Sequence, residues 1–296
     1  MKRVSLILVG LLFSVAGDLA AAQDVMSAPP KVIQINREWL KTGKSPMAHD
    51  KTEAAFVSAM SRGKLVGHYV ALNSMSGKPR ALYLTSYPSF EAWEKDNKTV
   101  EKNAALTAEL DRAIVADGEL LDSVDQAVFT YDEDLSYHPH PDISHARYYD
   151  ITVFHMRPGH HKEWYEVTKM YKAALDKAGS KAHWAAYGVA YGGEDGTFLM
   201  LTARTSMAEI DQDMADFKKV LETQGDEGMG KLDEAFAQAI GSSRSELFAV
   251  NPRQSYAEEA WIKADPDFWK PKKAAPETAS ARPAAPKPAA TKPGGN

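Results

Sequence analysis

Two stretches of the chain show the same succession of hydrophobic and polar positions. The first reads KVIQINREWLKTGKS from Lys31, and the second reads YYDITVFHMRPGHHK from Tyr148. Both are extended runs rich in β-branched and aromatic residues, and both stop at a glycine, Gly43 or Gly159. This pattern predicts a strand that ends in a turn before a helix, once in each half of the chain.

Each turn is followed by a stretch with helical periodicity. In the first, over residues 51–62, the apolar stripe is Phe56, Ala59, Met60 and Gly63. In the second, spacings of three and four relate Trp164, Val167, Tyr171, Ala174, Leu175 and Ala178. Because such spacings place side chains on one face, we expect two helices with one buried face each.

Hairpins follow both helices, from Gly67 and from His183, with turn glycines at Gly77 and Gly193. Ser89 and Ser206 then precede helical stretches and are expected to be N-caps. A second helical region and a closing strand complete each half, the strands reading DQAVFTYDE from Asp125 and SELFAV from Ser245.

The chain is therefore predicted to be α+β, with two ferredoxin-like βαββαβ repeats over residues 31–136 and 148–252. A linker rich in His and Pro, residues 137–147, joins them, and a short extension covers 253–270. This order, with the Pro-Gly turn of FHMRPGHHKEWYEV and the hairpin before a Ser-capped helix, resembles the dimeric α+β barrel superfamily, in tandem duplication. That superfamily includes antibiotic-biosynthesis-type monooxygenases and EthD-like and NIPSNAP-like proteins. The resemblance implies two sheets facing each other around a small cavity. Its members range from cofactor-free oxygenases and isomerases to haem enzymes and ligand sensors.

The N-terminal end of the sequence predicts a location outside the cytoplasm. Residues 1–22 combine two early positive charges, an apolar run and Ala20-Ala21-Ala22, which is typical of a cleaved bacterial signal peptide. We therefore expect a periplasmic or secreted protein. Residues 271–296 are mostly Pro, Ala and Lys, so a disordered basic tail is expected. Such a tail could remain solvated or contact anionic cell-envelope polymers.

Composition excludes several classes of function. The chain has no cysteine, so disulfides and thiolate chemistry are excluded. A net charge of −5, spread along the chain, gives no sign of a nucleic-acid partner. No segment after the leader is apolar enough to predict a transmembrane helix. The expected partner is a small organic molecule. A homo-oligomer is a further alternative, because the sequence leaves open whether the two repeats pair within one chain or between chains.

Alternation in the strands suggests a ligand cavity between the two sheets. If the polar set of each first strand faces that cavity, its lining includes residues from the strands and hairpins, namely Gln34, Asn36, His68, Tyr83, Thr152, Trp184 and Tyr187. Asp150 or Glu38 could then act as a general base, with His155 as a weaker candidate. The alternative is that these polar groups satisfy one another or meet solvent.

Six of the nine histidines fall between His138 and His161. A metal site would draw on His138, His140, His155 and His161, since imidazole binds zinc, copper and nickel. The spacing is poor, because His160 and His161 are neighbours and no His-x-x-x-His pair is present. We therefore expect no cofactor. The favoured function is binding of a small organic ligand between the sheets; the alternatives are a cofactor-free monooxygenase or isomerase and a periplasmic metal-binding protein.

Overall fold

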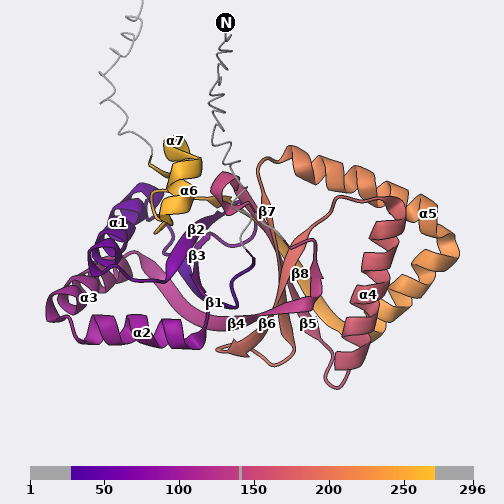
Figure 1. The fold of residues 1–296 in the computed structure, drawn as a ribbon, viewed down its shortest axis with the longest axis horizontal. Coiled ribbons are helices and arrows are strands. Elements are labelled where there is room, and N and C mark those ends of the chain that lie inside the picture. Colours follow the sequence, from indigo (N-terminus) through magenta and orange to yellow (C-terminus); the bar gives the residue numbers. More distant parts are fainter. Residues whose placement is uncertain (1–27, 140–141, 271–296) are drawn as a thin grey trace, which may run out of the picture.

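Eight antiparallel strands form a closed barrel in the order β1-β3-β2-β8-β5-β7-β6-β4 (Figure 1). The computed structural model describes residues 28–139 and 142–270. The expected signal peptide and basic tail lie outside these described residues.

Each half of the chain contributes four neighbouring strands. The first half comprises β1 (Val32–Leu40), α1 (Pro46–Gly63), β2 (His68–Ser74), β3 (Arg80–Tyr87), α2 (Phe90–Glu101), α3 (Ala104–Gly118) and β4 (Leu121–Tyr137). The second comprises β5 (Tyr148–Met156), α4 (His161–Ala178), β6 (Trp184–Tyr191), β7 (Thr197–Arg204), α5 (Ala208–Ala239) and β8 (Ile240–Val250). Helices α1 to α3 cover one side of the barrel, and α4 and α5 cover the opposite side (Figure 1).

The predicted order of elements is observed in both halves, with one difference in the helices. The second helical region of the first half is two helices, α2 and α3. Its counterpart α5 is a single span interrupted at Gly225, where the backbone leaves the helical conformation. The predicted linker begins where β4 ends and contains a short 3-10 helix, η1 (Ile143–His145).

Two seams join the halves into the barrel. Strand β4 pairs with β6 through contacts such as Tyr131↔Tyr187, and β2 pairs with β8 through Leu72↔Val250. The second seam is short, with three paired positions. Close to it, Arg80 of β3 forms an ion pair with Glu246 of β8. Pairing between the halves therefore occurs within one chain.

The interior of the barrel is filled by apolar side chains. Ile33 and Ile35 of β1 face inward, where they join a buried cluster that includes Tyr149, Ile151, Tyr187, Leu199, Leu201, Phe248 and Val250. The prediction that the polar positions of β1 face this space is wrong. Because the isoleucines occupy the interior, Gln34, Asn36 and Glu38 lie on the outer face of the sheet, toward α1.

The two predicted serine caps have different outcomes. The Ser89 side chain accepts a hydrogen bond from the Ala92 amide at the start of α2, as expected of an N-cap. The prediction for Ser206 is wrong, since α5 begins one residue later with Met207 in the cap position and no side-chain bond. Glu209 instead accepts a bond from the Thr205 amide at this end.

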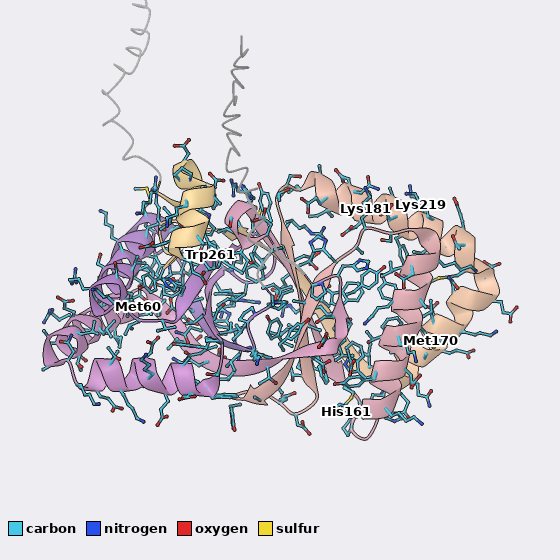
Figure 2. All side chains as sticks on the ribbon, viewed as in Figure 1. Met60, His161, Met170, Lys181, Lys219 and Trp261 are labelled. Carbon is cyan, nitrogen blue, oxygen red and sulfur yellow. The ribbon has the colours of Figure 1, made fainter. Side chains whose placement is uncertain are left out.

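The extension after β8 packs against the barrel and contributes two tryptophans to its core. It contains α6 (Glu259–Ala264) and α7 (Pro266–Trp269). Trp261, labelled in Figure 2, and Trp269 are each 4% exposed and join the apolar cluster of the interior. This segment is therefore an integral part of the fold.

Gly192, at the end of β6, should not tolerate a side chain. It has φ +74°, and a Cβ there would lie 2.4 Å from the Gln126 carbonyl oxygen. We expect Gly192→Ala to lower the free energy of unfolding by about 2 kcal/mol, from the left-handed backbone and the clash together. Gly159→Ala is the matched control: its φ is +83°, but nothing lies within 4 Å of the added Cβ. Urea unfolding should show a smaller loss, of about 1 kcal/mol, in the control. Equal losses in the two variants would show that the contact with the Gln126 carbonyl adds nothing to the cost at Gly192.

Candidate functional site

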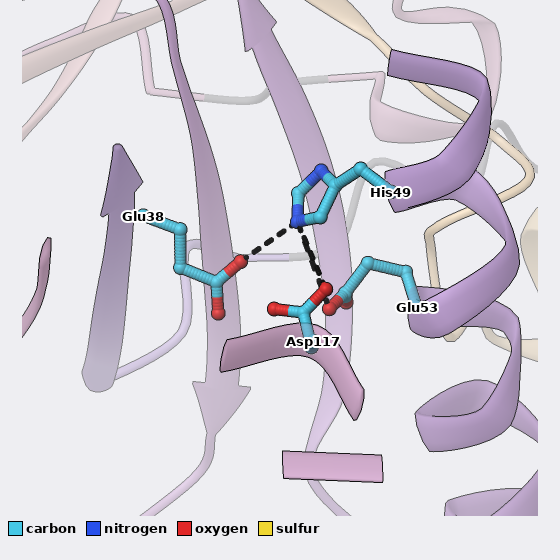
Figure 3. A group of neighbouring side chains, drawn as sticks. All are labelled: Glu38, His49, Glu53 and Asp117. Carbon is cyan, nitrogen blue, oxygen red and sulfur yellow. Dashed lines mark hydrogen bonds and ion pairs between the residues drawn. The ribbon is translucent and has the colours of Figure 1, made fainter. Parts of the chain in front are cut away.

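Four buried ionisable side chains meet between the sheet and the helices of the first half (Figure 3). Glu38 comes from β1, His49 and Glu53 from α1, and Asp117 from the end of α3. They are 9%, 1%, 3% and 2% exposed, in that order. One nitrogen or oxygen atom of each lies within 4.8 Å of those of the others. We call this group the carboxylate–histidine cluster.

His49 is the centre of the cluster. Its Nε2 atom lies 3.1 Å from Glu38 Oε2, 3.4 Å from Asp117 Oδ1 and 3.9 Å from Glu53 Oε1. On the other side of the ring, Nδ1 lies 3.3 Å from the amide nitrogen of Gln254. Three carboxyl groups therefore surround one edge of the imidazole.

Local structure explains how these residues meet. His49 and Glu53 are separated by four positions on α1, so they lie on the same helical face, which also carries Phe56 and Met60. Glu38 follows Gln34 and Asn36 at alternate positions of β1, on the sheet face that this helix covers. Asp117 is held at the end of α3 by the hydroxyl of Thr52.

Burial and mutual repulsion determine the ionisation of the cluster. Burial, together with the charges of Glu38 and Asp117, raises the pKa of Glu53 to about 9. Burial also raises the pKa of Glu38, against the hydrogen bond from His49. For His49, burial lowers the pKa, but hydrogen bonds to Asp117 and Glu38 outweigh it and raise the pKa to about 10. The three carboxyl groups thus favour a positive charge in their midst.

A small pocket of about 160 Å³ opens beside the cluster, between β1, β2, β3 and α1. We call it the outer pocket. Glu38 and Glu53 belong to both the pocket and the cluster, and the other lining residues are Gln34, Asn36, Phe56, Met60, Tyr69, Tyr83, Thr85 and Tyr87. Four buried polar atoms here have no hydrogen-bond partner: Asn36 Oδ1, Glu53 Oε1 and the hydroxyls of Tyr69 and Tyr83.

The structure separates the residues predicted to line one cavity. Gln34, Asn36 and Tyr83 lie together in the outer pocket, but in a location different from the predicted one. Thr152 and Trp184 lie in another pocket, of about 230 Å³, in the second half. Tyr187 packs inside the barrel against Tyr131, and the His68 ring stacks on Tyr256. No single cavity holds this set.

Of the predicted catalytic candidates, Glu38 alone reaches the outer pocket. Asp150 lies in the second-half pocket, where its carboxylate accepts a hydrogen bond from Arg204 at 3.2 Å. His155 is at the end of β5, half-exposed, with Nδ1 3.2 Å from the Thr197 hydroxyl. Asp150 and Glu38 therefore belong to separate sites.

The predicted histidine site is not assembled by the described residues. His138 stacks on Tyr137, and His161 stacks on Tyr165 at the start of α4, in the half opposite Met60 (Figure 2). His140 lies outside the described residues. Within residues 28–139 and 142–270, the carboxylate–histidine cluster is the only group of three or more potential metal ligands.

A signal for the cluster was present in the sequence but was missed. His49 and Glu53 form a His-x-x-x-Glu pair, the helical spacing that brings two ligands onto one face. Histidine pairs alone do not reveal this site, because one of its two helical ligands is a carboxylate. Nothing in the sequence near Asp117 marks it as a neighbour, because its contact with His49 depends on how α1 and α3 pack.

Comparison with known proteins defines the fold and leaves the activity open. No family model and no curated protein matches the chain. Among solved structures, an anthrone oxidase-like protein is similar, with a TM-score of 0.52 and 13% identity over 77% of this chain and 94% of its own. A Fusobacterium nucleatum protein with a provisional monooxygenase name has a TM-score of 0.46 and 11% identity over 75% and 93% of the two chains. A chlorite dismutase variant from Candidatus Nitrospira defluvii has a TM-score of 0.47 and 7% identity over 79% and 96%.

These neighbours belong to the dimeric α+β barrel superfamily, and the chain has that fold. The resemblance seen in the sequence is confirmed at this level. Among the described helices, none is both long and apolar enough to cross a bilayer.

Proposed function

We propose that the protein binds a small organic molecule in the outer pocket. The observation that carries this proposal is the group of unpartnered polar atoms in a pocket with aromatic and aliphatic walls. A buried polar group without a partner costs about 1–3 kcal/mol. A ligand with complementary hydrogen-bonding groups would remove that cost.

The size of the pocket limits the ligand to about one ring. A cavity of roughly 150 Å³ accommodates a benzene molecule, and the outer pocket measures about 160 Å³. The Tyr69 and Tyr83 hydroxyls can donate, and Asn36 Oδ1 can accept. Together these features favour a hydroxylated or carbonyl-bearing ring. An anthrone has three fused rings and exceeds this volume, so that substrate is not carried over from the structural neighbour.

An enzymatic role in the same pocket is a second candidate. Glu38 has a carboxyl group in the lining and could abstract a proton from a bound ring hydroxyl. Oxygenase chemistry on such a ligand would agree with the name of one structural neighbour, the anthrone oxidase-like protein. Turnover would appear as disappearance of the ligand's NMR signals with wild-type protein and their persistence with Glu38→Gln.

Ligand binding can be tested with single-ring probes. We expect phenol, catechol or 4-hydroxybenzaldehyde to give ligand-observed NMR binding signals with the wild-type protein. Asn36→Leu, which keeps side-chain size but removes the acceptor, should weaken binding of the best probe by about tenfold. Thr152→Val, at the matching strand position in the second half, is the control and should leave affinity unchanged. Equal affinity in all three proteins would show that the probe binds outside the outer pocket.

The remaining features of the sequence stay proposals. The shared order of elements in the two halves supports an origin by duplication of one ferredoxin-like unit. The composition of residues 1–22 supports export to the periplasm or beyond. The Lys- and Pro-rich composition of 271–296 supports weak contact with anionic envelope polymers.

A further inference from the structure

The carboxylate–histidine cluster has an excess of acidic groups. Three carboxyl groups face one imidazole, and among residues 28–139 and 142–270 no lysine or arginine forms an ion pair with any of the four. Buried carboxylates are normally paired with a cation, hydrogen-bonded throughout or bound to a metal. Here a charged His49 can balance one carboxylate, so a second ionised carboxylate would need another cation.

Two distances within the cluster match the spacing of ligand atoms in a metal coordination shell. Bonds from carboxylate oxygen or imidazole nitrogen to a divalent transition metal are about 2.1 Å long, so neighbouring ligand atoms lie roughly 3.0–3.4 Å apart. Two of the His49 Nε2 separations, 3.1 Å to Glu38 and 3.4 Å to Asp117, have these values. Glu53 Oε1, at 3.9 Å, needs a shift of about half an ångström.

Two buried oxygen atoms at the cluster are available to a ligand. Glu53 Oε1 is buried and has no hydrogen-bond partner, although it lies beside His49. The Tyr83 hydroxyl is also without a hydrogen-bond partner, belongs to a residue that is 4% exposed, and lines the outer pocket together with Glu38 and Glu53. An ion on the carboxylates would satisfy Glu53 directly, and a water or organic ligand on that ion would satisfy Tyr83.

We infer that Glu38, His49, Glu53 and Asp117 bind one divalent transition-metal ion. Carboxylate oxygens suit Mn²⁺, imidazole suits Fe²⁺ and Zn²⁺, and a mixed set favours this group over Ca²⁺. Glu38 and Glu53 also line the outer pocket, so that side of the ion is the one open to a further ligand. An oxygen atom of the proposed organic molecule could occupy that position.

Metal binding can be tested on the full chain, purified without a His tag and stripped with EDTA. Equilibrium dialysis with Mn²⁺ or Zn²⁺ should give one ion per chain by elemental mass spectrometry. At a hundredfold excess over Kd, the ion should raise Tm by about 5 °C or more. Wild-type protein that takes up no ion would overturn the inference.

Two variants locate the ion. Glu53→Gln preserves shape, so its Tm in EDTA should be no lower than that of the wild type, but its metal affinity should fall at least about tenfold. His155→Ala, in the exposed histidine region, should bind as the wild type does. Unchanged affinity in Glu53→Gln, or lost binding in His155→Ala, would contradict the inference.

The metal proposal and the ligand proposal can be tested independently of each other. Titration of the best ring probe in EDTA tests the outer pocket without any ion, and the dialysis tests the ion without any probe.

Discussion

Replacing His49 with leucine should lower the free energy of unfolding of the metal-free protein by about 3–5 kcal/mol. His49 is 1% exposed and is the one basic side chain that contacts Glu38, Glu53 and Asp117 among the described residues. Its removal takes the donor from Glu38 and the cationic neighbour from Glu53 and Asp117. Breaking a buried pair in this way costs more than the pair itself contributes. Urea denaturation in EDTA, followed by circular dichroism, measures the change.

A surface histidine provides the control for this variant. His145 pairs with Asp142 at 2.6 Å, but both side chains are about half exposed. Exposed pairs of this kind contribute about 0–1 kcal/mol, so His145→Leu should have little effect. If His49→Leu were equally mild, the stability of the buried carboxyl groups would not depend on the imidazole.

Trp164→Ala should cause a loss of similar size, about 3–5 kcal/mol, for a different reason. Trp164 is 1% exposed and packs between Phe154 and Phe198, with ring centroids 5.1 Å and 5.5 Å away. Truncation would leave a cavity in the core between α4, α5 and the sheet. The loss can be measured by chemical denaturation, with Tyr191→Ala at a 66% exposed position as control.

Trp164→Phe separates packing from hydrogen bonding. The indole Nε1 is buried and has no partner, so phenylalanine removes an unsatisfied donor while keeping most of the ring. We expect a loss of about 1 kcal/mol, well below that of alanine. A loss as large as that of alanine would show that the indole nitrogen has a partner after all.

Periodicity in the sequence was sufficient to predict the order of elements. Alternation identified β1 and β5, and the stripe from Trp164 through Val167 predicted α4 with the correct buried face. Repetition of the pattern then indicated the α+β barrel, and the comparison with solved structures supports that fold.

Alternation could not show which face of β1 meets which neighbour. Ile33 and Ile35 were compatible with packing on helices, and Gln34 and Asn36 with facing the barrel, because both faces are covered by other parts of the chain. Which face of β1 is directed into the barrel depends on α1. The buried stripe of this helix carries His49 and Glu53, so it can cover a polar sheet face. Such pairing of polar surfaces follows from tertiary packing, which residue patterns within a single strand do not record.

The contacts of the extension after β8 also could not be predicted from the sequence pattern. Its sequence gave no reason to expect that Gln254 would reach α1, yet its amide donates to Asp50 at 3.0 Å and approaches His49. Contacts between segments so distant along the chain depend on how the whole barrel closes.

The two seams also bear on how the protein avoids self-association while it folds. Until β2 meets β8 and β4 meets β6, each half exposes strand edges that could pair with another molecule. Because both halves are parts of one chain, the correct partner is present at an effective concentration of roughly millimolar, whatever the total protein concentration. Tethering thus gives the intramolecular seam a kinetic advantage over wrong pairing between chains.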